Sequence, residues 1–448
     1  MQKSGFRFIQ DLFGAISRRV KLGSDPQMSE PYVAIDRLLK SCHLLLTDLG
    51  EASKIAVAEQ ALLDYEELNQ EQRESFFQHL DDDFGVNPTN VRSAYEKWND
   101  SVNSKTLNRL FEAVEPKRQA LLRQLNLTNG ATLQLMKMRA DLLAVTNKNP
   151  QLTSIDNDFF HLFRSWFNRG FLVLKRIDWD APASILEKIV QYEAVHKIDG
   201  WHDLRRRLDE KDRRCYGFFH PATGDEPLIF VEVALCQGTA KAISPLLSGT
   251  YLPHQAPFDT AVFYSISNCQ RGLKGISFGN FLIKQVVVEL SQEIPELVKF
   301  ATLSPVPGFA KWASLQAENE PDVDKLIRML SQSVWHEDEA SQDEIRSHVL
   351  QLVARYIIAT KTSSKSLLDP VAKFHLGNGA CVDDIIWPAD LSKKGLSESY
   401  GVMINYWYEF SQIESRHEAF AQHAQVAMSD GVSAMLASKL SVIKGTFA

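Results

Sequence analysis

Three stretches of this sequence place polar side chains next to glycine or proline, and each could carry chemistry. They are residues 270–280, 303–309 and 374–379. Ser304 precedes two prolines, and His375 lies near two glycines in a stretch with few charges. An imidazole with an ordinary pKa near 6.5 suits general acid–base catalysis. Ser304 and His375 are therefore candidate catalytic residues, with a turn serine and a structural histidine as the alternatives.

The surroundings of Ser304 argue against one familiar use of a serine. No Gly-x-Ser-x-Gly motif surrounds it. In many hydrolases that motif holds the nucleophile on a sharp turn between a strand and a helix. The sequence therefore disfavours an ordinary serine hydrolase.

The glycine-rich stretch indicates an anion site. An apolar run at 261–266 precedes Gly272, Gly275 and Gly279, and a stretch with helical periodicity follows at 280–290. This pattern predicts a strand, a glycine loop, a helix and then a second strand that ends at Ser304. Loop N–H groups and a helix N-terminus both favour a phosphate or pyrophosphate. The glycine spacing alone is a weak signal, since many turns share it.

The elements that must position these residues differ between the two halves of the chain. Residues 32–170 have helical periodicity and predict a bundle for packing, oligomerisation or partner contact. From residue 171 the predicted order is a strand, two helices, three strands, a helix and a strand, which makes a sheet covered by helices. We expect domains at 1–168 and 169–448.

Further elements are expected downstream and around the site. Residues 245–257, with Tyr251 and His254, are predicted to be a long loop that could cover it. His375 is expected in a glycine-flanked turn. Strands are predicted at 380–387 and 401–408, and a helix at 417–440.

Composition excludes several classes of function. The 448 residues carry a net charge of −7, which disfavours a nucleic-acid binder. No apolar run is long enough to span a membrane. The five cysteines are scattered and the histidines lack partners at ligand spacing, so we expect a reducing compartment, no disulfides and no metal. Residues 1–22 are expected to form an ordinary helix, because Asp11 and the scarcity of serine disfavour a mitochondrial presequence.

Several long stretches, in order, resemble the malonyl-CoA decarboxylase family. The resemblance spans about residues 166–408. The matching stretches are residues 213–216, 226–228, 263–267, 270–284, 303–309 and 374–380. It implies an α+β multidomain protein in which an all-helical N-terminal bundle, used for homo-oligomer assembly, precedes a mixed α/β catalytic domain of the GNAT (N-acetyltransferase superfamily) type.

The resemblance also implies specific roles. Ser304 matches the family's active-site serine and His375 its active-site histidine. The family's acyl-CoA loop matches Leu273, Lys274, Gly275, Ile276, Ser277, Phe278 and Gly279. The implied reaction converts malonyl-CoA to acetyl-CoA and CO2, with coenzyme A as part of the substrate and no separate cofactor.

Alternatives to this reading stay open at the level of sequence. An acyl-CoA-dependent N-acyltransferase and a non-catalytic CoA-binding scaffold would both suit such a fold. We expect a cytoplasmic protein, since the chain ends in Gly-Thr-Phe-Ala448 and not in the Ser-Lys-Leu signal of peroxisomal members.

Overall fold

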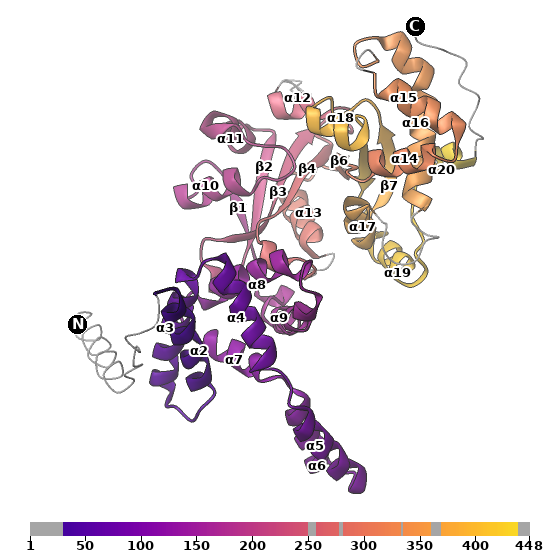
Figure 1. The fold of residues 1–448 in the computed structure, drawn as a ribbon. Coiled ribbons are helices and arrows are strands. Elements are labelled where there is room, and N and C mark those ends of the chain that lie inside the picture. The colour runs from indigo at the N-terminus through magenta and orange to yellow at the C-terminus, as the bar shows by residue number, and fades with distance from the viewer. Residues whose placement is uncertain (1–29, 250–256, 277–280, 333–334, 360–368, 438–448) are drawn as a thin grey trace. The chain divides into compact units, whose positions relative to one another are not determined.

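The computed structural model describes residues 30–249, 257–276, 281–332, 335–359 and 369–437 (Figure 1). The chain forms two compact units. The first comprises Met1–Phe171, His220–Gly224 and Gln270–Ser277, and the second comprises Leu172–Phe219, Asp225–Cys269 and Phe278–Ala448. Part of the predicted glycine loop therefore packs with the helical half of the chain.

The first unit is helical. Its α-helices are α2 (Glu30–Leu45), α3 (Glu51–Glu67), α4 (Gln70–Asp82), α5 (Pro88–Asp100), α6 (Ser104–Val114), α7 (Lys117–Leu125), α8 (Ala131–Thr146) and α9 (Thr153–Trp166). Helix α5 begins where the sequence predicts, because Asn87 accepts from the N–H groups of Thr89 and Asn90 and Pro88 occupies the first helical position. Buried phenylalanines of α4 and α9 contribute to the core of this unit.

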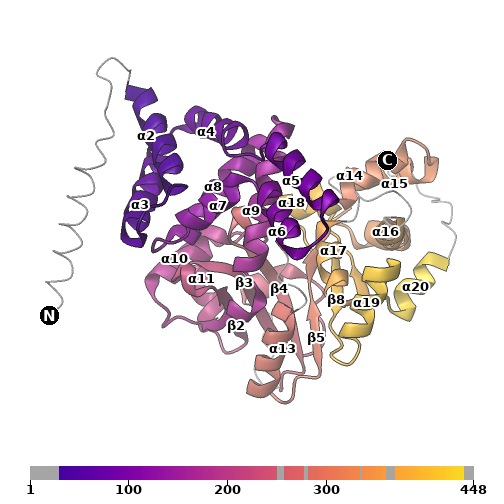
Figure 2. The ribbon, with the colours of Figure 1, turned by 90° about the horizontal axis from the view of Figure 1, so that it is seen from below.

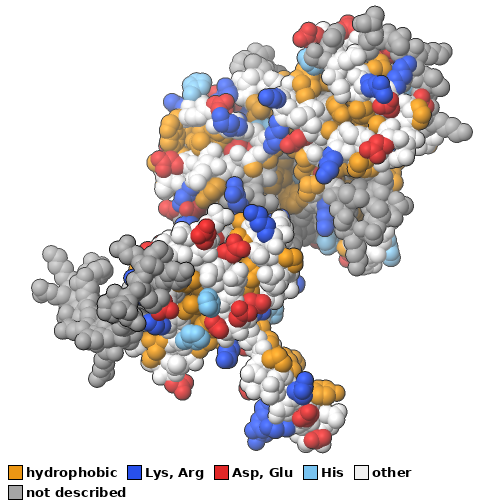
Figure 3. All heavy atoms as spheres, in the orientation of Figure 1, with side chains coloured by type: hydrophobic (Ala, Val, Ile, Leu, Met, Phe, Trp, Pro, Cys, Tyr) orange, Lys and Arg blue, Asp and Glu red, His pale blue; other side chains and the backbone are white. Residues whose placement is uncertain are grey.

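Helices α5 and α6 differ from the other helices of this unit. They pack mainly against each other and bury none of their residues. Figure 1 shows them as a hairpin that extends away from the remaining helices of the unit, and Figure 3 shows hydrophobic side chains on its surface. Within the part of the chain that the structure describes, the hairpin therefore keeps several apolar side chains exposed.

The second unit is built on a mixed sheet. Its strands are β1 (Val173–Ile177), β2 (Arg213–Phe219), β3 (Pro227–Cys236), β4 (Thr260–Asn268), β5 (Lys299–Thr302), β6 (Ser304–Pro305), β7 (Cys381–Ile386) and β8 (Met403–Trp407). The order is β1-β2-β3-β4-β5-β8-β6, and β7 pairs with β8. Strands β4 and β5 run parallel, with α13 (Phe281–Glu293) in the connection between them. The other strand pairs are antiparallel.

Helices cover both faces of this sheet (Figure 2). Apolar side chains of α10 (Ala183–Tyr192) and α11 (Gly200–Asp209) pack against Cys215 and Phe230 on one face. The end of α13 lies by Leu174 and Tyr216, whose side chains point to the other face because strand side chains alternate. The predicted architecture, a helical region followed by a mixed α/β domain, is confirmed.

Some local expectations were wrong and others cannot be compared with the structure. The predicted loop at 245–257 begins within a short helix, α12 (Ile243–Ser248), while Tyr251 and His254 lie outside the described residues. The single helix predicted at 417–440 is two helices, α19 (Ile413–His423) and α20 (Asp430–Ala437). The break occurs because Ala424 adopts a left-handed conformation with φ of 50°.

The remaining helices follow β6. They are α14 (Phe309–Ala317), α15 (Pro321–Leu330), α16 (Glu339–Ala359), α17 (Pro370–Gly377) and α18 (Lys393–Ser399). All five cysteines are free and buried. No helix in the described parts of the chain has the length and apolar character that crossing a membrane requires.

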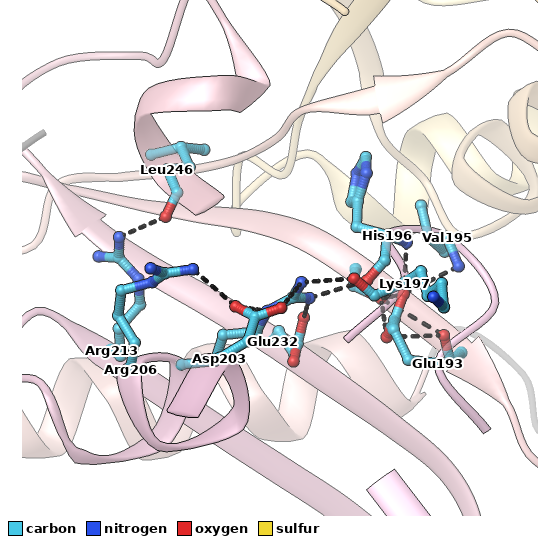
Figure 4. A network of polar contacts seen from close by, with 12 residues as sticks. Glu193, Val195, His196, Lys197, Asp203, Arg206, Arg213, Glu232 and Leu246 are labelled. Atoms are coloured by element: carbon cyan, nitrogen blue, oxygen red, sulfur yellow. Dashed lines mark hydrogen bonds and ion pairs between the residues drawn. The ribbon is translucent and has the colours of Figure 1, made fainter. Parts of the chain in front are cut away.

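A buried ionic network lies on the α11-covered side of the sheet (Figure 4). Arg207 Nη1 lies 3.3 Å from Glu232 Oε2 and donates to the carbonyl of His196, while Nη2 donates to Asp203. Glu232 is fully buried, and burial together with the nearby Glu193 carboxylate raises the pKa of Glu232 to about 8 against the opposing effect of Arg207. Glu232 therefore keeps its proton to a higher pH in the folded protein than in the unfolded chain.

This protonation predicts a pH-dependent stability. In the unfolded chain Glu232 loses its proton near pH 4.5, so between that pH and about 8 the folded state binds the extra proton. The free energy of unfolding should fall as pH rises through this window, by on the order of 2–4 kcal/mol from this group. Urea unfolding at pH 5.5 and 8.5 measures the effect, and Glu232→Gln should remove this contribution.

The exposed Glu187 on α10 offers a matched control. Glu187→Gln should leave the parent's pH dependence in place, because its side chain faces solvent. An unchanged pH dependence in Glu232→Gln would show that Glu232 is ionised in the folded protein.

Candidate active site

Ser304 and His375 meet in the interior of the second unit. Ser304 opens β6 and pairs with Ile404 of β8, and His375 lies in the last turn of α17. Ser304 Oγ is 3.0 Å from His375 Nε2, and both residues are buried. The structure thus brings together the two candidate catalytic residues, which are 71 positions apart in the chain.

His375 lies on a helix, so the predicted glycine-flanked turn is wrong at this position. Helix α17 begins because Asp369 accepts hydrogen bonds from the N–H groups of Val371 and Ala372, and Pro370 fixes the first helical residue. The helix ends at Gly377, two residues beyond His375. Gly379, with φ of 81°, then turns the chain into β7.

A line of uncharged groups continues from the pair. His375 Nδ1 lies 2.8 Å from the hydroxyl of Tyr408, and the His375 ring stacks on Tyr406 with a centroid distance of 4.5 Å. On the other side, Ser304 Oγ donates to Thr302 Oγ1 over 2.8 Å. Residues two apart on a strand share a face, which explains why Thr302 and Ser304 point the same way.

These contacts agree with one protonation pattern. Ser304 uses its hydroxyl proton to donate to Thr302, so the Ser304 oxygen can accept a hydrogen bond from His375 Nε2–H. His375 Nδ1 can then accept a hydrogen bond from the Tyr408 hydroxyl. Burial lowers the pKa of His375 to about 3. The imidazole is therefore neutral at physiological pH, and the tautomer with its proton on Nε2 fits the contacts with Ser304 and Tyr408.

Sequence reasoning missed Tyr408, Thr302 and Asp369 as parts of this arrangement. Asp369-Pro370 is a readable helix-start signal, because aspartate is a preferred N-cap and proline a preferred first residue. Tyr408 gave no comparable signal, since its contact with His375 depends on how β8 packs against α17. Thr302 is identified once Ser304 is placed on the same strand face.

The predicted acyl-CoA loop is described in part. Leu273 and Ile276 are buried while Lys274 and Gly275 are exposed, and Ser277, Phe278 and Gly279 lie outside the described residues. Gly275 has φ of 82°, a conformation that favours glycine. The Lys274 N–H already donates to the Arg271 carbonyl, so the exposed Gly275 and the Lys274 side chain are the described parts of the loop that could face an anion.

The loop is fixed to α8 through its backbone. A Cβ on Gly272 would lie only 1.9 Å from the Met136 carbonyl oxygen, so only glycine allows this approach. The buried Arg139 donates to the Gly272 carbonyl over 2.6 Å and pairs with Asp156. These contacts hold residues 270–276 within the helical unit. Across the described residues, no cluster of histidine, cysteine, aspartate and glutamate has the arrangement of a metal site.

The described residues thus form a helical region and a mixed α/β unit that contains a buried serine–histidine contact, an arrangement that suits an enzyme. Residues 170–445 match the family model of the malonyl-CoA decarboxylase C-terminal domain, and residues 84–167 match that of the N-terminal domain. The chain belongs to the malonyl-CoA decarboxylase family.

Individual relatives agree with this assignment. The mitochondrial malonyl-CoA decarboxylase of Mus musculus is 33% identical over 365 residues, which cover 74% of this chain and 73% of the relative. The crystal structure of malonyl-CoA decarboxylase from Rhodopseudomonas palustris is 46% identical, with a TM-score of 0.83 over 89% of this chain and 98% of that one. The enzyme from Agrobacterium vitis is 44% identical, with a TM-score of 0.84 over 89% and 99%.

The contact between Tyr408 and His375 makes a measurable contribution to stability. Tyr408→Phe leaves the buried Nδ1 without its partner, and we expect the free energy of unfolding to fall by about 1–2 kcal/mol in urea titrations. Tyr95→Phe, on the exposed face of α5, is the control and should have no effect. Equal stabilities for the two variants would exclude a hydrogen bond of ordinary strength at Nδ1.

Proposed function

We propose that this chain converts malonyl-CoA to acetyl-CoA and CO2. The observation that carries the proposal is the buried 3.0 Å contact between Ser304 and His375 in a chain of the malonyl-CoA decarboxylase family. Decarboxylation breaks the bond between the carboxylate and the α-carbon, and its electron pair passes to the thioester as an enolate. The α-carbon then takes up a proton, which gives acetyl-CoA.

His375 is the proposed proton donor in this reaction. Its neutral imidazole offers a proton at Nε2, and an enolate carbon is a stronger base than the imidazolate that this transfer leaves. Tyr408 orients the ring through Nδ1, and stacking on Tyr406 restricts its rotation. The imidazolate then takes a proton from solvent water, so the overall reaction consumes one proton from solution.

Ser304 is proposed to contact the malonyl carboxylate or take part in proton exchange there. A single hydroxyl is a modest partner for a carboxylate, and this suits the reaction. A cationic partner would stabilise the ionised substrate more than the transition state, in which the carboxylate charge is lost, and would slow the reaction. Burial of the site also strengthens every dipole that acts on the enolate oxygen.

The glycine loop is proposed to bind the coenzyme A part of the substrate. The Gly275 N–H and the Lys274 ammonium would hold phosphate, and Leu273 and Ile276 anchor the loop by their burial. Ser277, Phe278 and Gly279 would complete the loop by their match to the family. The reaction needs no further cofactor, because the thioester itself accepts the electron pair.

The proposal predicts the effect of two alanine substitutions. Ser304→Ala and His375→Ala should each preserve the fold and reduce turnover of malonyl-CoA by about a hundredfold or more, because each removes a group aimed at the reacting atoms. Release of CO2 and formation of acetyl-CoA measure turnover, and circular dichroism checks the fold.

The same assay separates the rival functions. Thioester consumption only when an amine is supplied would indicate an acyltransferase, and binding of CoA without CO2 release would indicate a scaffold. Full activity in both alanine variants would contradict the assigned roles.

We also propose that the chain forms a homo-oligomer through the α5–α6 hairpin. Leu107, Phe111 and Val114 form a stripe along α6, and Phe111 is 63% exposed. Tyr95 and Val102 of the same hairpin are also exposed, and a gathering of exposed apolar side chains is typical of an interface. A second copy is the proposed occupant, because an identical hairpin offers a matching apolar face.

A charged residue on this stripe should weaken assembly. We expect Phe111→Glu to raise the dissociation constant of the oligomer at least about tenfold, since it buries an unpaired charge. Sedimentation velocity over a concentration series measures this. Leu127→Glu, at a residue of the helical unit outside the hairpin that is 51% exposed, is the control and should assemble like the parent. A monomeric parent would refute the proposal.

The proposed compartment is the cytoplasm. Its support is that the five cysteines are all free and buried, as is usual in a reducing environment.

A further inference from the structure

Asp369 uses both of its carboxylate oxygens inside the second unit. Oδ1 accepts from the N–H groups of Val371 and Ala372, at 2.9 and 3.2 Å. Oδ2 accepts from Gly308 N–H at 3.1 Å and from the hydroxyl of Tyr356 at 3.2 Å. The side chain is almost fully buried. A buried carboxylate is tolerated here because four donors surround it.

The four donors come from the two segments that carry the site and from α16. Val371 and Ala372 are in the first turn of α17, the helix on which His375 lies. Gly308 follows Ser304 by four positions, in the turn before α14. One carboxylate therefore joins the start of the histidine helix to the turn that follows the serine.

Gly308 has to be a glycine for this junction to form. A Cβ at this position would lie 2.2 Å from the Tyr356 hydroxyl and 3.3 Å from Asp369 Oδ2. The backbone conformation is an ordinary one, so the requirement comes from close approach and not from backbone strain. The glycine after Pro307 thus allows Asp369 and Tyr356 to reach the main chain.

We propose that Asp369 is a positioning residue that sets the distance between Ser304 and His375. It acts through these residues and does not contact the reacting atoms. The inference rests on the proposed function for its kinetic consequence, whereas its geometric consequence is independent of any substrate. A carboxylate suits the task because each of its two oxygens accepts from a different segment.

Asp369→Asn should keep the hydrogen bonds of Asp369 to α17 and remove its hydrogen bond to Gly308. The asparagine oxygen can still cap α17, but the amide nitrogen would face the Gly308 N–H, donor against donor. We expect kcat for malonyl-CoA to fall about 10- to 100-fold, as for other small misplacements of catalytic groups, with KM changed less than about twofold. In a Ser304→Ala background, Asp369→Asn should lower kcat almost no further, because the contact between Ser304 and His375 is already lost.

A second readout needs no activity. Nuclear magnetic resonance of ring-labelled histidine, with the signal assigned by its absence in His375→Ala, follows titration of the imidazole. If Asp369→Asn loosens the pair and admits water, the pKa of His375 should rise by about one unit or more. Tyr356→Phe and Gly308→Ala disturb the same junction without changing Asp369 and should move the pKa in the same direction.

A substitution at another helix N-cap serves as the control for these experiments. Ser392→Ala removes the N-cap hydrogen bond of α18 and should lower only the melting temperature. The proposal is overturned if the junction variants keep the parent's histidine pKa, or if Asp369→Asn costs as much in the Ser304→Ala background as alone. A parent that releases no CO2 would refute the proposed function, and the histidine pKa would still decide the role of Asp369.

Discussion

The second unit depends on a short contact between two uncharged side chains that the chain must bring together from distant positions. In the described parts of the chain, no carboxylate is hydrogen-bonded to Ser304 or His375. Hydroxyl groups and a tyrosine ring orient the imidazole, and all of these groups are buried. The printed contacts of this pair involve hydroxyl groups and an aromatic ring, so the proposed reaction would depend on preorganised dipoles to stabilise its enolate.

The arrangement of strands in the sheet explains how these hydroxyl groups and the tyrosine ring come to surround the pair. Strands β5 and β6 bring Thr302 and Ser304 to one face, and β8, antiparallel to both, carries Tyr406 and leads directly to Tyr408. Asn405 donates to the main chain at Thr302 over 2.7 Å, which fastens the two strands where their ladder is short. The site is thus built on strands and one helix end, which hold side chains more firmly than loops do.

Many elements of the fold and part of the candidate site could be predicted from the sequence. The other parts could not, for physical reasons that differ from residue to residue. Local signals gave the strand before Ser304, the helix after the glycine loop and the start of α5, because periodicity and capping act over a few residues. His375 was misplaced in a turn because the glycines at 377 and 379 outweighed the N-cap at Asp369. Tyr408 is close to His375 only after the chain folds, and no spacing rule encodes that contact.

The backbone contact between Gly272 and Met136 bears on how this chain can be dissected. A fragment that starts after α9 would keep the glycine loop and lose α8, the surface against which the loop is pressed. The Gly272 carbonyl would lose its arginine, and Leu273 and Ile276 would lose the helical packing that buries them. Family models divide the two regions near residue 168, but the chain crosses that border again at residue 270, so the helical region is part of the loop's scaffold.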